Sequence, residues 1–352
     1  MKRIDYLEIY VSNLPAAVRF YKNTFQFHPI AYSEQNDHSS VLIHHGSIRF
    51  VLTASKTSSS DVAHFILLHG EGVKDIAFIT ENVESQFELA IQKGHQAILA
   101  PTTYIINDEL IQKATVSAFG EITHTFIQRQ NENQYSLTFF SYNQPIAITK
   151  EAIFSIDHLA VCVHQGDLSY IINDYLETYG FIQSHEESII TTNSGMNSKV
   201  VQSRSGQIKI VFLEPLQGLK QSQIEEFLIS FGGPGVQHIA FATNNIISAV
   251  KTIRDSGLEM LSIPDQYYEI QKNRFPINAH DLNILRDYSI LFEECDRGFL
   301  YQIFSKPVVR RPTLFFEIIQ RMGNDGFGSD NIKALFQAME QEQLSRETSD
   351  IR

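Results

Sequence analysis

The sequence predicts an α+β protein in which a βαβββ module is repeated, giving two half-open β-barrel domains followed by a C-terminal helix. Three pairs of similar segments occur in the same order in the two halves of the chain, which indicates an internal duplication. The pairs are IDYLEIYV (4–11) and IDHLAVCV (156–163), GVKDIAFIT (72–80) and GVQHIAFAT (235–243), and HTFIQR (124–129) and FFEIIQR (315–321). Each matched segment is short and rich in apolar residues, as expected of a β-strand.

The remaining elements of the first half follow from periodicity and turn residues. Apolar residues at helical spacing predict helices over 13–27 and 82–95, the second ending near Gly94. Alternation of apolar and polar residues predicts hairpins over 40–53 and 116–129. The first half is therefore expected to contain two βαβββ modules that curl around a cavity.

The second half repeats this pattern. Helices are predicted over 167–181 and 244–261, paired strands over 196–215 and a strand over 298–306. A last helix is predicted over 331–344, because its apolar residues recur at helical spacing.

These elements define the expected domains. We assign residues 1–145 to an N-terminal domain and 153–344 to a C-terminal domain that includes the closing helix. The segment 142–152 has no strong period and is the expected linker, whereas 345–352 is expected to be a flexible tail. At 352 residues, the chain is long enough for each domain to bury its own core.

Composition excludes several classes of function. A formal net charge of −12 argues against a nucleic-acid-binding protein, which needs a basic face. No apolar run approaches the roughly 18 residues of a membrane span, and the alternating N-terminal segment reads as a strand rather than a signal peptide. The two cysteines, Cys162 and Cys295, have no CxxC partner, so we expect free thiols and a cytoplasmic location.

Three predicted strands of the second half each carry one polar residue among apolar neighbours: His158, His238 and Glu317. A single histidine on a strand is more often a hydrogen-bonded core residue than a metal ligand. Two histidines and one carboxylate together, however, are the ligand set of a non-haem Fe(II) facial triad, which leaves coordination positions open. The sequence therefore predicts an iron site in the C-terminal domain.

Comparison of the two halves supports this interpretation. The residues opposite the three candidate ligands in the first half are Tyr6, Asp75 and Thr125. The duplicated module therefore does not need histidine at these positions in order to fold. We expect the N-terminal domain to lack metal ligands.

With the repeat and the triad in place, the chain resembles the 4-hydroxyphenylpyruvate dioxygenase family of the vicinal oxygen chelate superfamily. The resemblance covers nearly the whole chain and is strongest in IDHLAVCV, SQIEEF, GVQHIAF, YYEI, QIFSKP, FFEIIQR and GFGSDNIKALF. It implies Fe(2+) bound by His158, His238 and Glu317, and an aryl 2-oxo acid and O2 as small-molecule substrates. It also implies a homodimer or a higher homo-oligomer, with neither nucleic acid nor membrane as a partner.

The family has two branches, which form either homogentisate or 4-hydroxymandelate. Where the dioxygenases usually carry a phenylalanine, a glycine and an asparagine, this chain has Ile332, Asp330 and Leu213. These departures resemble the hydroxymandelate synthase branch. The expected reaction is conversion of 4-hydroxyphenylpyruvate and O2 to 4-hydroxymandelate and CO2 by decarboxylation and benzylic hydroxylation.

Matching the chain to the family position by position also gives a predicted substrate pocket. Ile332 is expected to set the site of oxidation, because a phenylalanine there would hold the ring closer to the oxidant. Gln302 and Phe304 are expected beside the reacting group. The predicted substrate-binding residues are Ser198, Val211, Leu213, Gln223, Gln237, Phe327, Asn331 and Phe336. For each of these residues taken alone, ordinary packing is an equally good explanation.

Four alternatives stay open at this point. The chain could form homogentisate in tyrosine breakdown, or it could act on phenylpyruvate. It could also be a non-catalytic binding or metal-sequestering member of the superfamily, although the intact ligand set argues against this. A ring-cleaving catechol dioxygenase is disfavoured by the QIFSKP and FFEIIQR motifs.

Overall fold

The computed structural model describes residues 1–106, 109–130, 141–142, 153–191, 194–216, 220–274, 279–295 and 298–335. Phe336, most of the predicted terminal helix and the predicted tail lie outside these residues, as does the predicted linker beyond Tyr142. The part of the predicted helix that is described, residues 331–335, is helical.

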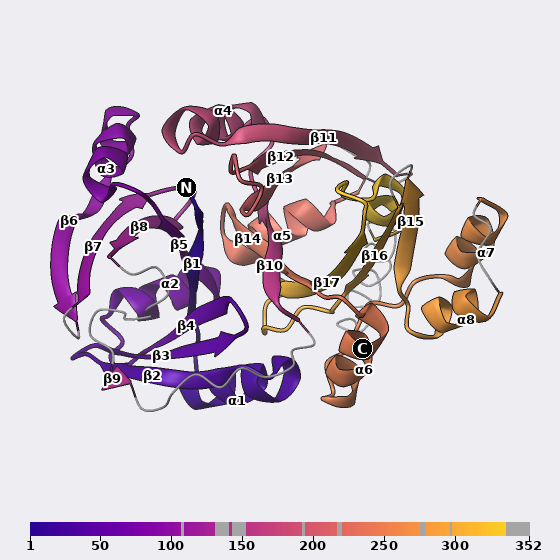
Figure 1. Ribbon diagram of the computed structural model, residues 1–352, viewed down its shortest axis with the longest axis horizontal. Coiled ribbons are helices and arrows are strands. Elements are labelled where there is room, and N and C mark those ends of the chain that lie inside the picture. Colours follow the sequence, from indigo (N-terminus) through magenta and orange to yellow (C-terminus); the bar gives the residue numbers. More distant parts are fainter. Residues whose placement is uncertain are drawn as a thin grey trace.

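The first half forms a nine-stranded sheet, shown in indigo to magenta in Figure 1. Its elements in chain order are β1 (Arg3–Tyr10), α1 (Leu14–Phe25), β2 (His28–Glu34), β3 (His38–His45), β4 (Ile48–Ser55), α2 (Asp61–His69), β5 (Gly72–Ile79), α3 (Val83–Gln92), β6 (Ala97–Ile106), β7 (Glu109–Ser117), β8 (Thr123–Arg129) and β9 (Ser141–Tyr142). The strand order is β6-β7-β8-β5-β1-β4-β3-β2-β9.

The second half forms an eight-stranded sheet in the order β11-β12-β13-β10-β14-β17-β16-β15. Its elements are β10 (Ser155–Cys162), α4 (Leu168–Thr178), β11 (Ile182–Ile190), β12 (Gly195–Gln202), β13 (Lys209–Leu216), α5 (Gln223–Phe231), β14 (Gly235–Ala242), α6 (Ile246–Asp255), α7 (Asp265–Arg274), α8 (Ala279–Asp287), β15 (Leu291–Cys295), β16 (Gly298–Phe304) and β17 (Phe315–Met322).

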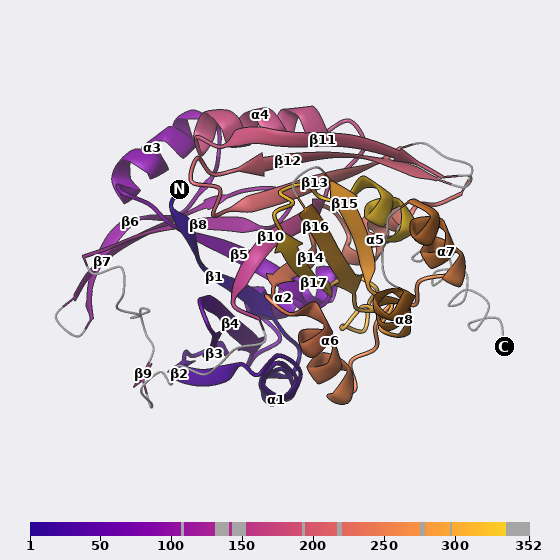
Figure 2. The ribbon, with the colours of Figure 1, turned by 45° about the vertical axis from the view of Figure 1, so that its right-hand side comes forward.

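The sheet topology has the predicted duplicated modules. In each βαβββ unit the first strand pairs in parallel with the last, as in β1 with β4 and β10 with β13. The two units of each half meet through their first strands, which pair antiparallel as β1 with β5 and β10 with β14. The second half therefore repeats the first, with α7 and α8 added outside its sheet beside β15 (Figure 2).

Several helices end earlier than their periodicity predicts. The helix expected over 244–261 ends at Asp255, because Gly257 has a φ of 92° that a continuing right-handed helix cannot accommodate. The helix expected over 13–27 ends at Phe25, and Gln26 follows in the left-handed conformation. Helix α5 was not predicted, although the capping box between Ser222 and Glu225 marks its start.

The two halves share one large hydrophobic cluster, and the first half also buries a separate apolar cluster that includes Tyr6. Phe25 at the end of α1 packs against Phe241 on β14 and Phe316 on β17, with ring centroids 5.3 and 4.7 Å apart. Phe241 and Phe316 are themselves stacked at 5.3 Å. Aromatic packing therefore holds the two halves together, while the first half also keeps an apolar cluster of its own.

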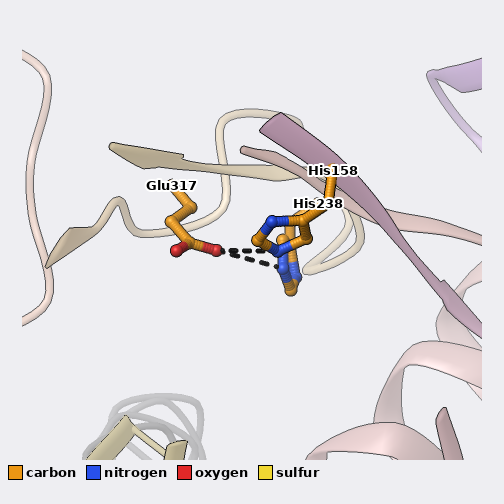
Figure 3. Close-up of side chains that lie close together, drawn as sticks. All are labelled: His158, His238 and Glu317. Atoms are coloured by element: carbon orange, nitrogen blue, oxygen red, sulfur yellow. Dashed lines mark ion pairs between the residues drawn. The ribbon is translucent and has the colours of Figure 1, made fainter. Parts of the chain in front are cut away.

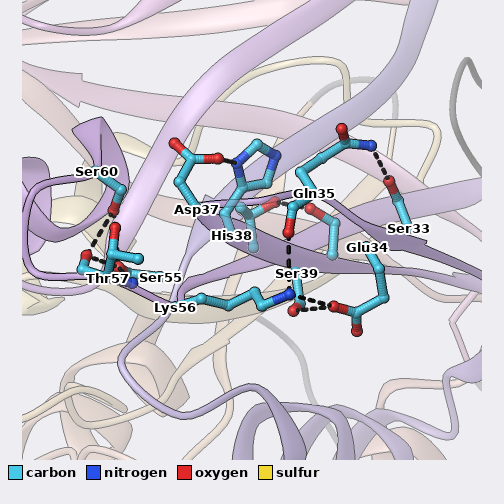
Figure 4. Close-up of polar contacts among 12 residues, drawn as sticks. Ser33, Glu34, Gln35, Asp37, His38, Ser39, Ser55, Lys56, Thr57 and Ser60 are labelled. Carbon is cyan, nitrogen blue, oxygen red and sulfur yellow. Dashed lines mark hydrogen bonds and ion pairs between the residues drawn. The ribbon is translucent and has the colours of Figure 1, made fainter.

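Polar contacts secure one edge of the first half, away from this core (Figure 4). The Lys56 ammonium lies 3.2 Å from the Glu34 carboxylate and donates to the backbone carbonyl of Gln35. Ser60 caps α2 by accepting from the backbone N–H of Ala63 at 3.0 Å.

Among the described residues, no helix has both the length and the apolar character needed to cross a membrane.

Candidate metal centre and substrate pocket

Three adjacent strands place His158, His238 and Glu317 on one face of the second sheet. His158 on β10 pairs with Ala240 on β14, and Ala240 pairs with Glu317 on β17. His238 lies two residues before Ala240, so its side chain points to the same face. The small side chain of Ala240 leaves the space between the three residues open.

The three side chains converge in the interior of the second half (Figure 3). Glu317 Oε2 lies 3.2 Å from His158 Nε2 and 3.5 Å from His238 Nε2. Ligands about 2.1 Å from a metal and at right angles to each other are about 3.0 Å apart, so this spacing fits one face of an octahedron. All three residues are buried, and their donor set suits Fe(2+).

The electrostatics of the triad favour a bound cation. Burial raises the pKa of Glu317, but His158 and His238 outweigh it and lower that pKa to about 2, so the carboxylate is charged at neutral pH. Burial lowers the pKa of His158, but Glu317 and Asp157 outweigh it and raise that pKa to about 9. For His238, burial dominates and the pKa is lowered.

A buried ion pair orients His158. Asp157 Oδ1 accepts from His158 Nδ1 at 2.9 Å, while Arg321 donates to both oxygens of the same carboxylate at 2.8 and 2.9 Å. This arrangement places the proton on Nδ1 and leaves Nε2 facing Glu317. His238 is oriented in a similar way, because its Nδ1 lies 3.3 Å from Gln237 Oε1.

A chain of side-chain amides orients Glu317. Gln302 donates to Glu317 Oε1 at 2.9 Å, and Asn331 donates to Gln302 Oε1 at 2.9 Å. Tyr267 on α7 donates to Asn331 Oδ1 at 2.7 Å and accepts from the backbone N–H of Phe292. Sequence comparison placed Tyr267 in the YYEI motif but assigned it no role, because its partner Asn331 lies 64 positions away.

Most of the predicted substrate residues surround one pocket next to the triad. Its walls include the predicted residues Ser198, Val211, Leu213, Gln223, Gln237, Gln302, Phe304, Phe327 and Ile332. Asn331 is fully buried behind Gln302, so its contact to the pocket is through that amide. Phe336 lies outside the described residues. Sequence reasoning missed five further wall residues: His185, Met196, Val200, Ile224 and Leu335.

The polar groups of this pocket differ in whether they have an atom free to form a hydrogen bond with a ligand. The Gln302 amide is engaged by Glu317 and Asn331, and the Gln237 carbonyl oxygen faces His238. Ser198 donates to the backbone carbonyl of Glu187 at 3.3 Å. By contrast, Gln223 Oε1 is buried and makes no hydrogen bond within the described part of the chain.

The equivalent position in the first half is built differently. Asp75 accepts from Thr123 at 2.6 Å, and Thr125 is hydrogen-bonded to Thr115 at 2.9 Å. Burial raises the pKa of Asp75 to about 6, in contrast to Glu317, whose pKa the two histidines lower. Tyr6 is buried in the apolar interior of this barrel.

Comparisons with known proteins agree with this architecture. A model of the Glyoxalase/Bleomycin resistance protein/Dioxygenase superfamily matches residues 3–108. The 4-hydroxyphenylpyruvate dioxygenase of Dictyostelium discoideum is 34% identical over 366 residues, covering 98% of this chain and 99% of that protein. The enzyme of the same name from Yarrowia lipolytica is also 34% identical, covering 97% of this chain and 92% of that protein.

A solved structure extends the comparison to three dimensions. It is a triple mutant of 4-hydroxymandelate synthase from Streptomyces coelicolor, with a TM-score of 0.89 at 30% identity, and it covers 97% of this chain and 99% of that one. The shared fold is the vicinal oxygen chelate fold, as the motifs predicted. With identity of this level along its whole length, the chain belongs to the 4-hydroxyphenylpyruvate dioxygenase family.

Proposed function

We propose that this protein is an Fe(2+)-dependent oxygenase that converts 4-hydroxyphenylpyruvate and O2 to 4-hydroxymandelate and CO2. The observation that carries the oxygenase assignment is the buried triad of His158, His238 and Glu317 at the end of an apolar pocket. Ferrous iron held by this set would offer open positions to the 2-oxo acid and to O2, and would supply the redox chemistry.

The residues of the chain supply binding and orientation. Asp157 and Gln302 fix the directions of His158 and Glu317, so the ligand atoms are arranged before a metal arrives. Val211, Leu213 and Phe327 give the pocket apolar walls that exclude water and pack against an aryl ring. The free carbonyl oxygen of Gln223 can accept a hydrogen bond from a polar group of the substrate.

The choice of product rests on Ile332. Its side chain forms part of the pocket wall, next to Leu335 and on the same helical segment as Asn331. An isoleucine fills less of the pocket than a phenylalanine would, so the aryl ring can move aside and the benzylic carbon can approach the oxidant. A displacement of about 1 Å is enough to change the outcome of such a reaction.

Formation of homogentisate is the second candidate, because the relatives with 34% identity bear the name 4-hydroxyphenylpyruvate dioxygenase. Both reactions use the same metal, the same chelating group and the same first decarboxylation. They differ in whether the aromatic ring or the benzylic carbon is oxidised afterwards. Phenylpyruvate is the alternative substrate, since it carries the same 2-oxo acid group.

Product analysis separates these candidates. The protein is loaded anaerobically with Fe(2+), mixed with 4-hydroxyphenylpyruvate and O2, and its products are separated by chromatography. We expect 4-hydroxymandelate as the main product. Homogentisate as the main product would overturn the proposed regiochemistry. Absence of O2 uptake both with 4-hydroxyphenylpyruvate and with phenylpyruvate would overturn the substrate class.

A further inference from the structure

Two polar side chains that no part of the proposed mechanism uses lie on β11, and one of them lines the substrate pocket. His185 lines the pocket, and Glu187 lies on the same face of the strand two residues later. His185 Nε2 and Glu187 Oε2 are both buried, and neither makes a hydrogen bond with any described residue. The two side chains form an ion pair with each other, but neither atom has a hydrogen bond, which is costly for buried polar atoms.

The separation of the two atoms indicates what could satisfy them. They lie 3.7 Å apart, which is too far for a hydrogen bond between them. One oxygen atom can lie about 2.8 Å from both at the same time. A hydroxyl group fits this arrangement, because it can donate to the carboxylate and accept from the imidazole N–H.

The pair also lies in the direction that an aryl group would take. The Phe327 ring packs against the His158 ring at 5.4 Å and against the His185 ring at 5.8 Å. Phe327 therefore connects the metal-ligand end of the pocket to the His185 end. A ring packed on Phe327 would therefore lie within reach of both the triad and His185.

We propose that His185 and Glu187 bind the ring hydroxyl of an aryl 2-oxo acid, with the hydroxyl donating to Glu187 Oε2 and accepting from His185 Nε2–H. This inference rests on the proposed function and gives its substrate a required chemical group, the para hydroxyl. An anionic substituent is disfavoured at this wall. Burial raises the pKa of the neighbouring Glu293, and the charges of Asp330 and Glu187 raise it further, so the surroundings are already acidic.

The test compares 4-hydroxyphenylpyruvate with phenylpyruvate, which lacks only the hydroxyl. Binding of each acid to the anaerobic Fe(2+) protein is measured by calorimetry and by the visible absorption of the chelated ferrous ion. The variants are His185→Phe, which keeps an aromatic ring against Phe327, and Glu187→Gln. Glu186→Gln is the matched control, because Glu186 is exposed on the opposite face of the same strand.

We expect the native protein to bind the hydroxylated acid at least about 10-fold more tightly than phenylpyruvate, as a hydrogen bond to a charged group allows. Each of the two variants should reduce this preference to less than about 3-fold while phenylpyruvate affinity stays within about 2-fold, and the control should keep the preference. Equal affinities in the native protein, or variants that weaken both acids alike, would overturn the inference and leave the proposed oxygenase intact. Failure of both acids to bind would overturn the proposed function as well.

Discussion

Replacing Asp157 by asparagine should weaken metal binding and destabilise the fold at the same time. The carboxylate accepts one hydrogen bond from His158 and two from Arg321, and it is nearly buried. Burial raises the pKa of Asp157, but Arg321 and His158 outweigh it and hold that pKa well below its usual range. Asp157 is thus ionised at neutral pH, and the substitution removes the counter-charge of a largely buried guanidinium.

The structure gives the size of both effects. Breaking a buried ion pair by neutralising one partner costs about 3 kcal/mol of unfolding free energy. Loss of the group that orients a metal-ligating histidine weakens metal binding by roughly 10- to 100-fold. Unfolding is measured with urea on the metal-free protein, and Fe(2+) affinity is measured anaerobically by competition with a chromophoric chelator.

The duplication provides a matched control. Asp5 is the counterpart of Asp157 in the first half, and it pairs with Arg49 at 2.9 Å and with Arg129 at 2.5 Å. Asp5→Asn should cost a similar free energy of unfolding without changing Fe(2+) affinity. If Asp157→Asn lowers the Fe(2+) affinity no more than Asp5→Asn does, Asp157 does not position His158 for a metal and the reasoning is refuted.

Three further changes test other parts of the account. Ile332→Phe should shift the product ratio from 4-hydroxymandelate toward homogentisate by restricting the ring, and an unchanged ratio on chromatography would contradict this role. Burial lowers the pKa of His124 from 6.5 to about 3. Between pH 3 and pH 6.5 the unfolded chain therefore binds one more proton at this residue than the folded chain does. Stability should therefore be lost as pH falls below 6.5, by up to about 1.4 kcal/mol per pH unit, and His124→Phe should flatten that dependence in urea unfolding. Phe25→Ala should cost about 3 to 4 kcal/mol, measured in the same way, because it opens a cavity between Phe241 and Phe316; a cost below about 1 kcal/mol would mean that the halves do not depend on this contact.

The modules could be predicted because their signals are local and occur twice, and the triad could be predicted because its residues depart from that repeat. A strand keeps its apolar pattern in both copies, whereas His158, His238 and Glu317 appear in one copy only. The contrast between the copies separates residues needed for the fold from residues that a metal needs. The strand pairing then places the three on one face, as the ligand hypothesis requires.

The parts that sequence reasoning missed depend on contacts between distant segments. Strand β11 is mostly polar and exposed, so the inward direction of His185 becomes visible only from its pairing with β12. Asn331 was expected to contact substrate. Its side-chain amide is instead hydrogen-bonded to Tyr267 and Gln302, which lie on two other elements. The packing of Phe25 against Phe316 joins residues almost 300 positions apart, which no periodicity records.

The stoichiometry of Fe(2+) binding in three proteins tests most directly whether His158, His238 and Glu317 form the metal site. An anaerobic titration should show one tight site per native chain and none in Glu317→Ala, because the carboxylate is the one anionic ligand of the triad. Thr125→Ala, at the equivalent position of the first half, should bind one Fe(2+) with unchanged affinity. A tight site that survives in Glu317→Ala would place the metal elsewhere and contradict the account.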